Sequence, residues 1–193
     1  MEQTRVHLYL VRHGRTDWND ARRWQGANDI PLNDAGRAQA AVLAETLVGR
    51  VDAVFASDLL RASETARIVA EKVAAPVLAL DADLRERSYG VFEGLTAEEC
   101  EARYPEAWAA RDRDRNSVPP GGEPHAQVVA RMERAMHRIA ATMRERGGRG
   151  LVVSHGSSLR MFLERVLGRS LPGLANLELH EVVHDGSRFH ALG

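Results

Sequence analysis

Residues 8–19 read Leu-Tyr-Leu-Val-Arg-His-Gly-Arg-Thr-Asp-Trp-Asn. The apolar start of this stretch belongs to a β-type run, Val6–Val11, which ends directly on an Arg-His-Gly triplet that contains His13. A second apolar run, Leu151–Ser154, ends in the same way on His155 and a glycine. Because the carboxyl ends of parallel strands meet at one edge of an open α/β sheet, we expect the two histidines to share a site there.

Strand and helix patterns alternate along the rest of the chain. The expected elements are strands at Val51–Ala56 and Pro76–Leu80, helices at 34–47, 58–74, Leu95–Tyr104, Glu106–Arg115, Glu123–Arg146 and Ser157–Leu167, and a C-terminal hairpin of Asn176–Val183 and Arg188–Leu192. This alternation predicts an α/β fold with three layers, in which a mostly parallel sheet carries helices on both faces. A chain of 193 residues without a linker or a low-complexity block is expected to form one domain, residues 1–193.

Polar residues and apolar spacing predict the starts and the faces of three helices. Asn33 is expected to cap the helix over residues 34–47, and Ser57 or Asp58 the helix that follows. One apolar side of the first helix carries Ala38, Val42 and Leu47. The long helix has an amphipathic pattern, with Val129, Met132, Met136, Ile139, Ala140 and Met143 on its apolar side.

The composition is typical of a compact soluble enzyme. Hydrophobic residues make up 44% of the chain and charged residues 27%, and a formal net charge of −1 gives no global field to hold nucleic acid or an anionic membrane. Cys100 is the only cysteine, so neither an internal disulfide nor a multi-cysteine metal site is expected. No apolar stretch resembles a signal peptide or a membrane span, and the expected location is cytoplasmic.

An arginine next to a histidine at a strand end indicates an anion-binding site. The guanidinium of Arg12 matches phosphate oxygens bidentately, and phosphate is the simplest anion that fits. Arg61 falls in the first turn of its expected helix, where backbone N–H groups also favour an anion. Phosphoryl transfer depends on positioning and charge neutralisation, and an imidazole with an ordinary pKa of ~6.5 keeps a neutral nitrogen available as nucleophile.

Four segments, in order, carry the same chemistry as a known family. They are Arg12-His13-Gly14 with Asn19, then Ser57–Ala66, Leu84–Gly90 and Ser154-His155-Gly156. Together they resemble the histidine phosphatase superfamily, which includes the cofactor-dependent phosphoglycerate mutases. The resemblance runs from about residue 6 to about residue 167, and four ordered motifs make it far more specific than an Arg-His-Gly triplet alone.

The resemblance implies a metal-independent phosphomonoester hydrolase that works through a phosphohistidine intermediate and needs no cofactor. It assigns the nucleophile to His13, with Arg12 and Arg61 holding the phosphate oxygens. His155 would bind the transferring phosphoryl group and, when protonated, stabilise its charge. Glu86 would protonate the leaving alkoxide and later take a proton from water, as one carboxylic acid can do in turn.

Further residues match family positions that contact phosphate or substrate. These are Asn19, Gln25, Gly26, Ser57 and Gly156. Ser57 is also a candidate helix cap, and Gly156 also suits a tight strand-to-helix turn. The resemblance implies no metal ligand among them.

A mutase reaction is the alternative within the family. Cofactor-dependent mutases add a covering segment rich in arginine and proline, and residues 104–122 leave little room for one. Ser88 and Ala97 stand where the mutases carry a histidine and a substrate-binding lysine. Residues 92–96 (Phe-Glu-Gly-Leu-Thr) and 121–123 (Gly-Gly-Glu) resemble the small bacterial phosphatases, so hydrolysis is expected.

Two other classes of protein use some of the same residues. A metal hydrolase could take the strand-end histidines as ligands, with carboxylates from Asp17, Asp58 and Glu86. The sequence has no His-Glu-x-x-His motif, however, and Arg12 and Arg61 would repel a cation. A non-catalytic domain that binds phosphorylated ligands is expected to lack the nucleophile, the glutamate or the second histidine, and this chain has all three.

The expected partner is a small phosphorylated metabolite, and neither nucleic acid nor a membrane is expected. Arg111, Arg113 and Arg115 could meet an anionic substrate, and a solvated helix face suits them equally well. Trp108 or the C-terminal strands could form a homodimer interface, and core or sheet-edge roles are as natural for them.

Overall fold

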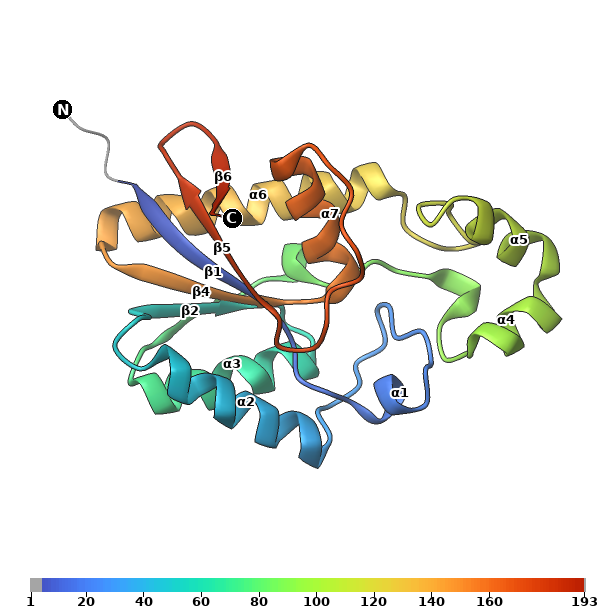
Figure 1. Ribbon diagram of the computed structural model, residues 1–193, viewed down its shortest axis with the longest axis horizontal. Helices are drawn as coiled ribbons and strands as arrows, with labels where there is room; N and C mark the ends of the chain where they lie inside the picture. The colour runs from blue at the N-terminus through green and yellow to red at the C-terminus, as the bar shows by residue number, and fades with distance from the viewer. Residues whose placement is uncertain (1–4, 193) are drawn as a thin grey trace.

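The strand that carries the Arg-His-Gly triplet, β1 (Val6–Arg12), lies inside the sheet of the computed structural model (Figure 1). The structure describes residues 5–192. Over that range the strands form one sheet in the order β3-β2-β4-β1-β5-β6. The other strands are β2 (Ala53–Ala56), β3 (Val77–Leu80), β4 (Arg149–Ser154), β5 (Leu179–His184) and β6 (Phe189–Leu192).

The strand directions confirm the predicted, mostly parallel sheet. β1 pairs in parallel with β4, β4 with β2, and β2 with β3. Only β5 runs the other way, because it pairs antiparallel with both β1 and β6 and forms the predicted hairpin with β6. The carboxyl ends of β1, β2, β3 and β4 therefore meet at one edge of the sheet.

Helices cover both faces of the sheet, as predicted (Figure 1). α2 (Asp34–Leu47) and α3 (Leu60–Val73) pack on one face, and α6 (His125–Arg146) and α7 (Gly156–Leu167) on the other. Side chains alternate between the faces along β1, since successive residues of a strand point to opposite sides. Leu8 and Leu10 join the core under α6 and α7, whereas Tyr9 and Val11 join the core under α2 and α3.

The buried side of α2 differs from the predicted one. Asn33 caps this helix as predicted, because its side chain accepts a hydrogen bond from the Gly36 N–H at 2.9 Å. Val42, however, is 69% exposed, and Ala38 is exposed as well. The buried residues are Gly36, Ala40, Ala44 and Leu47. Leu47 is buried as predicted, and the other buried positions are small residues, which let α2 lie close to its neighbours.

The start of α3 also corrects a prediction. The N-cap is Leu59, which makes no side-chain capping bond, so neither Ser57 nor Asp58 caps the helix. The Ser57 hydroxyl accepts a hydrogen bond from the Leu59 N–H at 3.3 Å in the turn before the helix. Asp58 pairs with Arg85 at 2.6 Å, which ties this turn to the segment that carries Glu86.

The long helix α6 presents nearly the predicted apolar side to the core. Its buried residues are Val128, Met132, Ala135, Met136, Ile139, Ala140 and Met143. Val129 is only half-buried, because Val128 takes the core position one residue earlier. No helix in residues 5–192 is long and apolar enough to cross a membrane.

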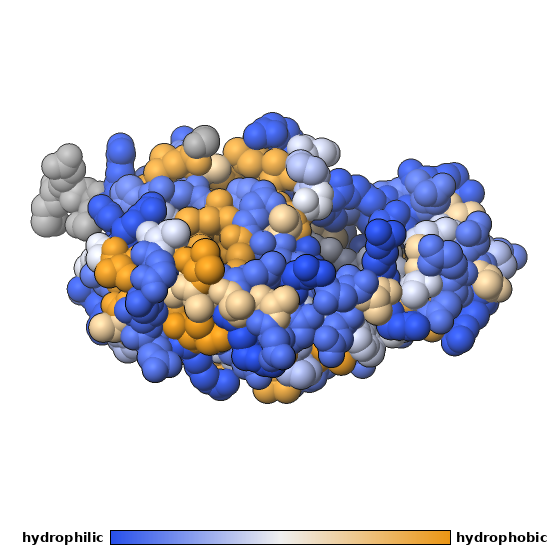
Figure 2. Space-filling model, turned by 60° about the horizontal axis from the view of Figure 1, so that its bottom comes forward, coloured by the Kyte–Doolittle hydropathy of each residue, from blue (hydrophilic) through white to orange (hydrophobic). Residues whose placement is uncertain are grey.

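Short helices extend the molecule beyond the edge where the strands end. These are α1 (Asp17–Asp20), the 3₁₀ helices η1 (Ala82–Leu84) and η2 (Gly90–Phe92), α4 (Ala97–Arg103) and α5 (Pro105–Arg113). α4 and α5 project farthest from the sheet (Figure 1). The surface is hollowed where they meet the rest of the molecule, and hydrophilic residues surround the hollow (Figure 2).

Candidate active site

Two neighbouring parallel strands bring the histidines together. β1 pairs with β4 so that Arg12 lies opposite Ser154, and the next residue of each chain segment is a histidine. The ring centroids of His13 and His155 lie 5.2 Å apart. Both residues are buried, at 2% and 0% exposed. The structure therefore places both at one edge of the sheet, as expected for parallel strands.

The hydrogen bonds of His13 define which ring nitrogen can react. Its Nδ1 lies 2.7 Å from the carbonyl oxygen of Gly14. A carbonyl oxygen only accepts, so Nδ1 must carry the proton and Nε2 keeps its lone pair. The loop itself is held because the Gly14 N–H donates to the Thr65 hydroxyl at 3.1 Å. The ring is thus fixed with Nε2 as the nucleophilic atom.

Burial and positive charge keep His13 neutral. Burial lowers the pKa of His13 well below its usual value of 6.5, and the charges of Arg61 and Arg12 lower it further. The hydrogen bond to Gly14 raises the pKa, with a smaller effect. Neutral imidazole is the form that can attack phosphorus, so the surroundings favour the reactive state.

The ring of His155 lies close to that of His13 and has no hydrogen-bond partner in the described part of the chain. Neither of its ring nitrogens forms a hydrogen bond with any residue between 5 and 192, although both are buried. Burial lowers the pKa of His155 well below its usual value, and Arg61 and then His13 add to the effect. A buried polar group without a partner costs about 1–3 kcal/mol. This arrangement points to a polar ligand near the ring.

Arg12 and Arg61 bring two guanidinium groups to the same edge. Arg12 donates from Nη1 to the Leu174 carbonyl at 2.6 Å. Arg61, in the first turn of α3, donates to the carbonyls of Gly26 at 2.8 Å and Asn28 at 2.7 Å. Within the described residues, the Nε of each arginine is buried and has no partner. Burial lowers the pKa of Arg61 to about 10, so this group stays cationic at neutral pH.

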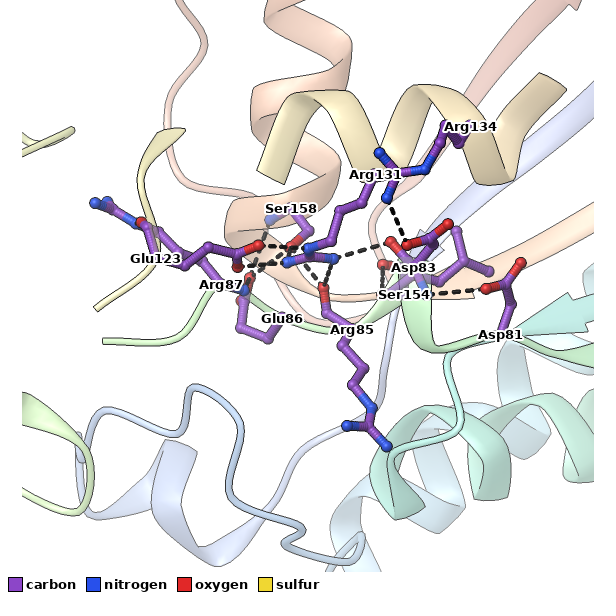
Figure 3. Close-up of polar contacts among 11 residues, drawn as sticks. Asp81, Asp83, Arg85, Glu86, Arg87, Glu123, Arg131, Arg134, Ser154 and Ser158 are labelled. Carbon is purple, nitrogen blue, oxygen red and sulfur yellow. Dashed lines mark hydrogen bonds and ion pairs between the residues drawn. The ribbon is translucent and has the colours of Figure 1, made fainter. Parts of the chain in front are cut away.

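Glu86 lies at the N-terminus of α7, next to Ser158 (Figure 3). Its Oε1 accepts hydrogen bonds from the Arg87 N–H at 2.8 Å and from the N–H and hydroxyl of Ser158 at 3.0 and 3.1 Å. Its Oε2 accepts from the Ser157 N–H at 3.1 Å. Oε2 therefore has the larger free capacity, and it is the oxygen suited to carry a proton.

Most of the predicted site residues line a cleft of about 290 Å³. Those that contribute to its walls are Arg12, His13, Asn19, Gln25, Gly26, Arg61, Glu86 and Gly156. Ser57 is buried outside the cleft wall and serves the turn before α3, so its predicted contact with phosphate has no support in the geometry. His155 is not in the wall either, and it reaches the site through its contact with His13.

The two predicted amides have different surroundings. The Asn19 amide oxygen accepts a hydrogen bond from the Thr16 N–H at 3.1 Å, as part of a capping box that starts α1. The Gln25 amide oxygen is buried and has no hydrogen-bond partner among residues 5–192. Gln25 is thus the amide with a polar atom left for a ligand, whereas Asn19 also shapes the loop after His13.

Two glycines allow close packing at this edge of the sheet. A Cβ on Gly156 would lie 3.3 Å from Cδ and Nε of Arg12, so the glycine lets that guanidinium pack over the start of α7. A Cβ on Gly14 would lie 2.6 Å from the carbonyl oxygen of Gly36 in α2. The loop that carries the nucleophile therefore rests directly on the backbone of α2.

The far wall of the cleft is aromatic and basic. The ring centroid of Trp24 lies 4.6 Å from that of Tyr89 and 6.4 Å from that of Trp108. The Arg111 guanidinium lies over both indole rings, 5.3 Å from the centroid of Trp24 and 5.4 Å from that of Trp108. Arg111 and Arg115 line the cleft. Arg113 is exposed and does not line the cleft. Of the three arginines considered from sequence, two therefore face the cleft and one faces solvent.

Several residues of the site were not predicted from sequence. The Tyr89 hydroxyl is hydrogen-bonded to Ser157, and burial raises the pKa of Tyr89. Arg87 is 1% exposed and donates to the carbonyls of Ser117 at 2.7 Å and Glu123 at 2.8 Å. The only sequence signal for them is their place within the Leu84–Gly90 segment, since long-range contacts leave no local pattern.

The geometry does not favour the alternative of a metal hydrolase. Over residues 5–192, no three or more His, Cys, Asp or Glu side chains are grouped so that they could hold a metal ion. Asp58, one of the carboxylates considered as a ligand, is paired with Arg85. The positive charges around His13 belong to arginines, which would repel a cation.

Known proteins give the same assignment as the geometry. The family model described as the histidine phosphatase superfamily (branch 1) matches residues 8–191. Phosphoglycerate mutase-like protein 4 of Arabidopsis thaliana is 41% identical over 164 residues, which cover 83% of this chain and 70% of that protein. The metal-independent phosphoserine phosphatase of Arabidopsis thaliana is 38% identical over 189 residues, 95% of this chain and 78% of that protein.

Solved structures agree. The mycobacterial glucosyl-3-phosphoglycerate phosphatase in complex with VO3 superposes with a TM-score of 0.85 and 31% sequence identity. The match covers 96% of this chain and 97% of that one. The chain therefore belongs to the histidine phosphatase superfamily and is a phosphatase.

Proposed function

We propose that this phosphatase hydrolyses small phosphorylated metabolites through a phosphohistidine intermediate at His13, without a metal ion. The observation that carries the proposal is the state of the His13 ring. Its Nδ1 is held by the Gly14 carbonyl at 2.7 Å, and its lowered pKa keeps Nε2 unprotonated in a cleft lined by arginines. A fixed, neutral imidazole beside cationic groups is suited to attack a phosphate ester.

In the first step, Nε2 of His13 forms a bond to phosphorus while the ester oxygen–phosphorus bond breaks. The leaving alkoxide takes a proton from Glu86. In the second step, the Glu86 carboxylate accepts a proton from water, whose oxygen attacks phosphorus as the nitrogen–phosphorus bond breaks. Inorganic phosphate leaves, and His13 and Glu86 return to their starting states.

Three cations or potential cations neutralise the transferred group. Arg12 and Arg61 have buried Nε donors that are free of protein partners in the described residues, which suits them to phosphate oxygens. His155 is neutral in the protein alone because its pKa is lowered. A bound phosphate dianion would favour its protonated form, since an opposite charge nearby stabilises the imidazolium.

Hydrolysis is favoured over a mutase reaction by the residues around the cleft. The position where the mutases carry a substrate-binding lysine is Ala97 in this chain. Ala97 begins α4 and does not line the cleft. Lys72, the only lysine in the sequence, pairs with Glu45 of α2 at 2.7 Å and is not part of the cleft wall. The site therefore lacks the substrate-binding lysine that the mutases use.

The positive charge in the cleft supports a substrate with a second acidic group. Eight of the residues that line the cleft are arginines, whereas Glu86 is the one carboxylate among them. Two of these arginines are neutralised by glutamates of α4 and α7. Arg111 lies over indole rings, and Arg115 donates to a backbone carbonyl at 2.8 Å. A carboxylate or second phosphate on the substrate would fit between them and the catalytic histidine.

The proposed compartment is the cytoplasm. Phosphorylated metabolites are its usual solutes, and the unpaired, buried Cys100 suits a reducing environment. Such metabolites are the proposed partners, and we assign no role to nucleic acid.

A labelling experiment tests the proposal. Brief incubation with substrate labelled at phosphorus, in the presence of excess chelator, should give an acid-labile and base-stable phosphoprotein. The label should be absent in His13→Ala. Label that persists in His13→Ala would refute the nucleophile, and loss of labelling on chelation with recovery by one metal would refute the metal-independent mechanism.

A second assay separates hydrolysis from the mutase reaction. With a phosphoglycerate and a bisphosphorylated primer, water should remain the main phosphoryl acceptor. Transfer between glycerate positions that is much faster than phosphate release would show a mutase instead.

A further inference from the structure

One arginine of α6 uses every N–H donor of its side chain in contacts around the segment that carries Glu86. Arg131 donates from Nε and Nη2 to the two carboxylate oxygens of Glu123, at 2.8 and 2.9 Å. Its Nη1 donates to the carbonyls of Asp83 at 2.9 Å and Arg85 at 2.5 Å, and its Nη2 also reaches the Ser158 hydroxyl at 3.4 Å. Five contacts match the five N–H donors of a guanidinium (Figure 3).

Glu123 contacts the same segment at residues that follow Glu86 in the sequence. Its N–H donates to the carbonyl of Ser88 at 2.9 Å, and its carbonyl accepts from Nε of Arg87 at 2.8 Å. The Glu123–Arg131 pair therefore contacts residues both before and after Glu86. The side chains of Glu123 and Arg131 are 20% and 11% exposed. This ion pair is therefore less exposed than those formed by Asp58, Asp81 and Asp83 next to it.

Ser158 connects the pair to the carboxylate itself. Its hydroxyl lies 2.8 Å from the Arg85 carbonyl and 3.1 Å from Oε1 of Glu86, and its N–H donates to the same Oε1 at 3.0 Å. Because Arg131 donates to this hydroxyl, the hydroxyl hydrogen is directed towards Arg85 and Glu86. The position of the Glu86 carboxylate thus depends on a chain of contacts that begins at Arg131.

We propose that the Glu123–Arg131 pair is a positioning unit for proton transfer by Glu86. Neither residue lines the cleft, so neither touches the substrate, and both act through the segment they hold. The proposal rests on the acid–base role of Glu86 in the proposed function. Displacement of a reacting group by about 1 Å can cost ~10²-fold in rate, which sets the effect expected when the unit is disturbed.

The test compares leaving groups in single-turnover phosphorylation of His13. Arg131→Lys keeps the charge but has three donors on one nitrogen, so it cannot keep all five contacts. Phosphorylation by an alkyl phosphate, whose alkoxide needs a proton, should fall about 10²-fold in this variant. Phosphorylation by nitrophenyl phosphate, whose leaving group needs none, should fall less than about threefold.

Arg134→Lys is the matched control. Arg134 lies on the same helix and pairs with Asp83 at 3.0 Å, but its side chain is 59% exposed and makes no contact with the Arg85 carbonyl. Both phosphorylation rates should stay at the wild-type level. Equal losses for the two leaving groups in Arg131→Lys, or no loss at all, would overturn the proposal.

A double variant separates positioning from general damage. If Arg131 acts through Glu86, adding Arg131→Lys to Glu86→Gln should change the alkyl phosphate rate by less than about threefold, because the two act as one unit. A further loss of ~10²-fold would overturn the proposal. Should Arg131→Lys fail to fold, Glu123→Gln, which keeps one acceptor for Arg131, is expected to show the same discrimination and decides the same outcomes.

The wild-type enzyme in the same assay separates this proposal from the proposed function. Absence of a His13 label in the wild type would refute the function itself. A label that forms in the wild type and discriminates between leaving groups in Glu86→Gln, but not in Arg131→Lys, would refute only the positioning unit.

Discussion

Two pairs of histidine rings in this molecule have the same spacing and different chemistry. The ring centroids of His13 and His155 are 5.2 Å apart in the cleft, and those of His137 and His184 are 5.2 Å apart where α6 meets the β5–β6 hairpin. Each pair has at least one arginine nearby, and burial lowers the pKa of His184 as it does that of the cleft histidines. His137 is exposed, but His184 is buried like the cleft histidines, so neither ring spacing nor the burial and nearby charge of one ring distinguishes a reactive imidazole.

The difference lies in which ring nitrogen carries the proton. Nδ1 of His184 accepts hydrogen bonds from Nη2 of Arg144 at 2.7 Å and from the Gly186 N–H at 3.2 Å, so its proton is on Nε2. His13 is the reverse, because its Nδ1 donates to a carbonyl and its Nε2 keeps a lone pair. The type of group that Nδ1 meets, an acceptor in His13 and donors in His184, thus decides whether Nε2 keeps a lone pair for nucleophilic attack.

Removal of the nucleophile should give the largest effect. His13→Ala is expected to lower turnover by on the order of 10⁴-fold or more, because the covalent route is lost. His137→Ala removes an exposed ring from the other pair and should leave turnover within about twofold of the wild type. The measurement is kcat with an alkyl phosphate, after both variants are shown to be folded. Comparable losses in the two variants would break the distinction between the pairs.

Replacement of the cleft carboxylate should give the next largest effect. Glu86→Gln is expected to slow phosphorylation by an alkyl phosphate by ~10²–10⁴-fold and to spare nitrophenyl phosphate far more. Asp185→Asn is the counterpart at the hairpin, where this carboxylate accepts from Nε2 of His190 at 2.7 Å, and it should change neither rate. Single-turnover phosphorylation is the proper measurement because Glu86 is also proposed to activate water. Equal losses for both leaving groups would show that the proton donor lies elsewhere.

A smaller effect is expected from the arginine between the indole rings. Arg111→Met should raise KM about tenfold for a phosphate ester that also carries a carboxylate, such as phosphoserine, since one charge-assisted hydrogen bond contributes ~1.5–3 kcal/mol. KM for nitrophenyl phosphate should not change. Arg113→Met, on the exposed side of the same helix, should affect neither substrate. An equal rise for both substrates would assign Arg111 to the phosphate itself.

The smallest expected effect is on stability. The folded protein keeps His155 neutral because its pKa is lowered, whereas the unfolded chain takes up a proton below about pH 6.5. Proton uptake by the unfolded chain lowers the free energy of unfolding as pH falls, by about 1.4 kcal/mol per pH unit for each such histidine. Urea unfolding at pH 7.5 and pH 5.5 should therefore show a shallower pH dependence in His155→Gln than in the wild type. An unchanged slope would mean that folding does not lower the pKa of His155.

Most of the fold could be predicted from the sequence because its strands and helices have strong local patterns. The strands that end at His13 and His155, the alternating helices and the C-terminal hairpin around Asp185 all follow from apolar runs and turn residues. The grouping of Arg12, Arg61 and Glu86 in one cleft was expected from family resemblance, since no local pattern relates residues so far apart. The strands supply the physical reason, because they all end at the same edge.

What the sequence could not predict are features that depend on packing. α2 is rich in alanine, so its apolar pattern fits more than one face, and only contact with α3 decides that Ala40 and Ala44 are buried and Val42 exposed. The role of Arg131 also depends on packing, because the sequence around it shows only an arginine on an amphipathic helix. Its five contacts arise only when the segment 83–85, Glu123 and Ser158 come together around it in the folded protein.

The contact between Gly14 and Gly36 has a consequence for how this enzyme can diverge. The loop after the nucleophile rests on the α2 backbone, and neither position has room for a side chain that could be exchanged for another. The opposite wall is built from side chains, Trp24, Trp108 and Arg111, which can be replaced one at a time. New substrates are therefore expected to arise by substitution on the α4–α5 side, while the wall that holds His13 stays unchanged.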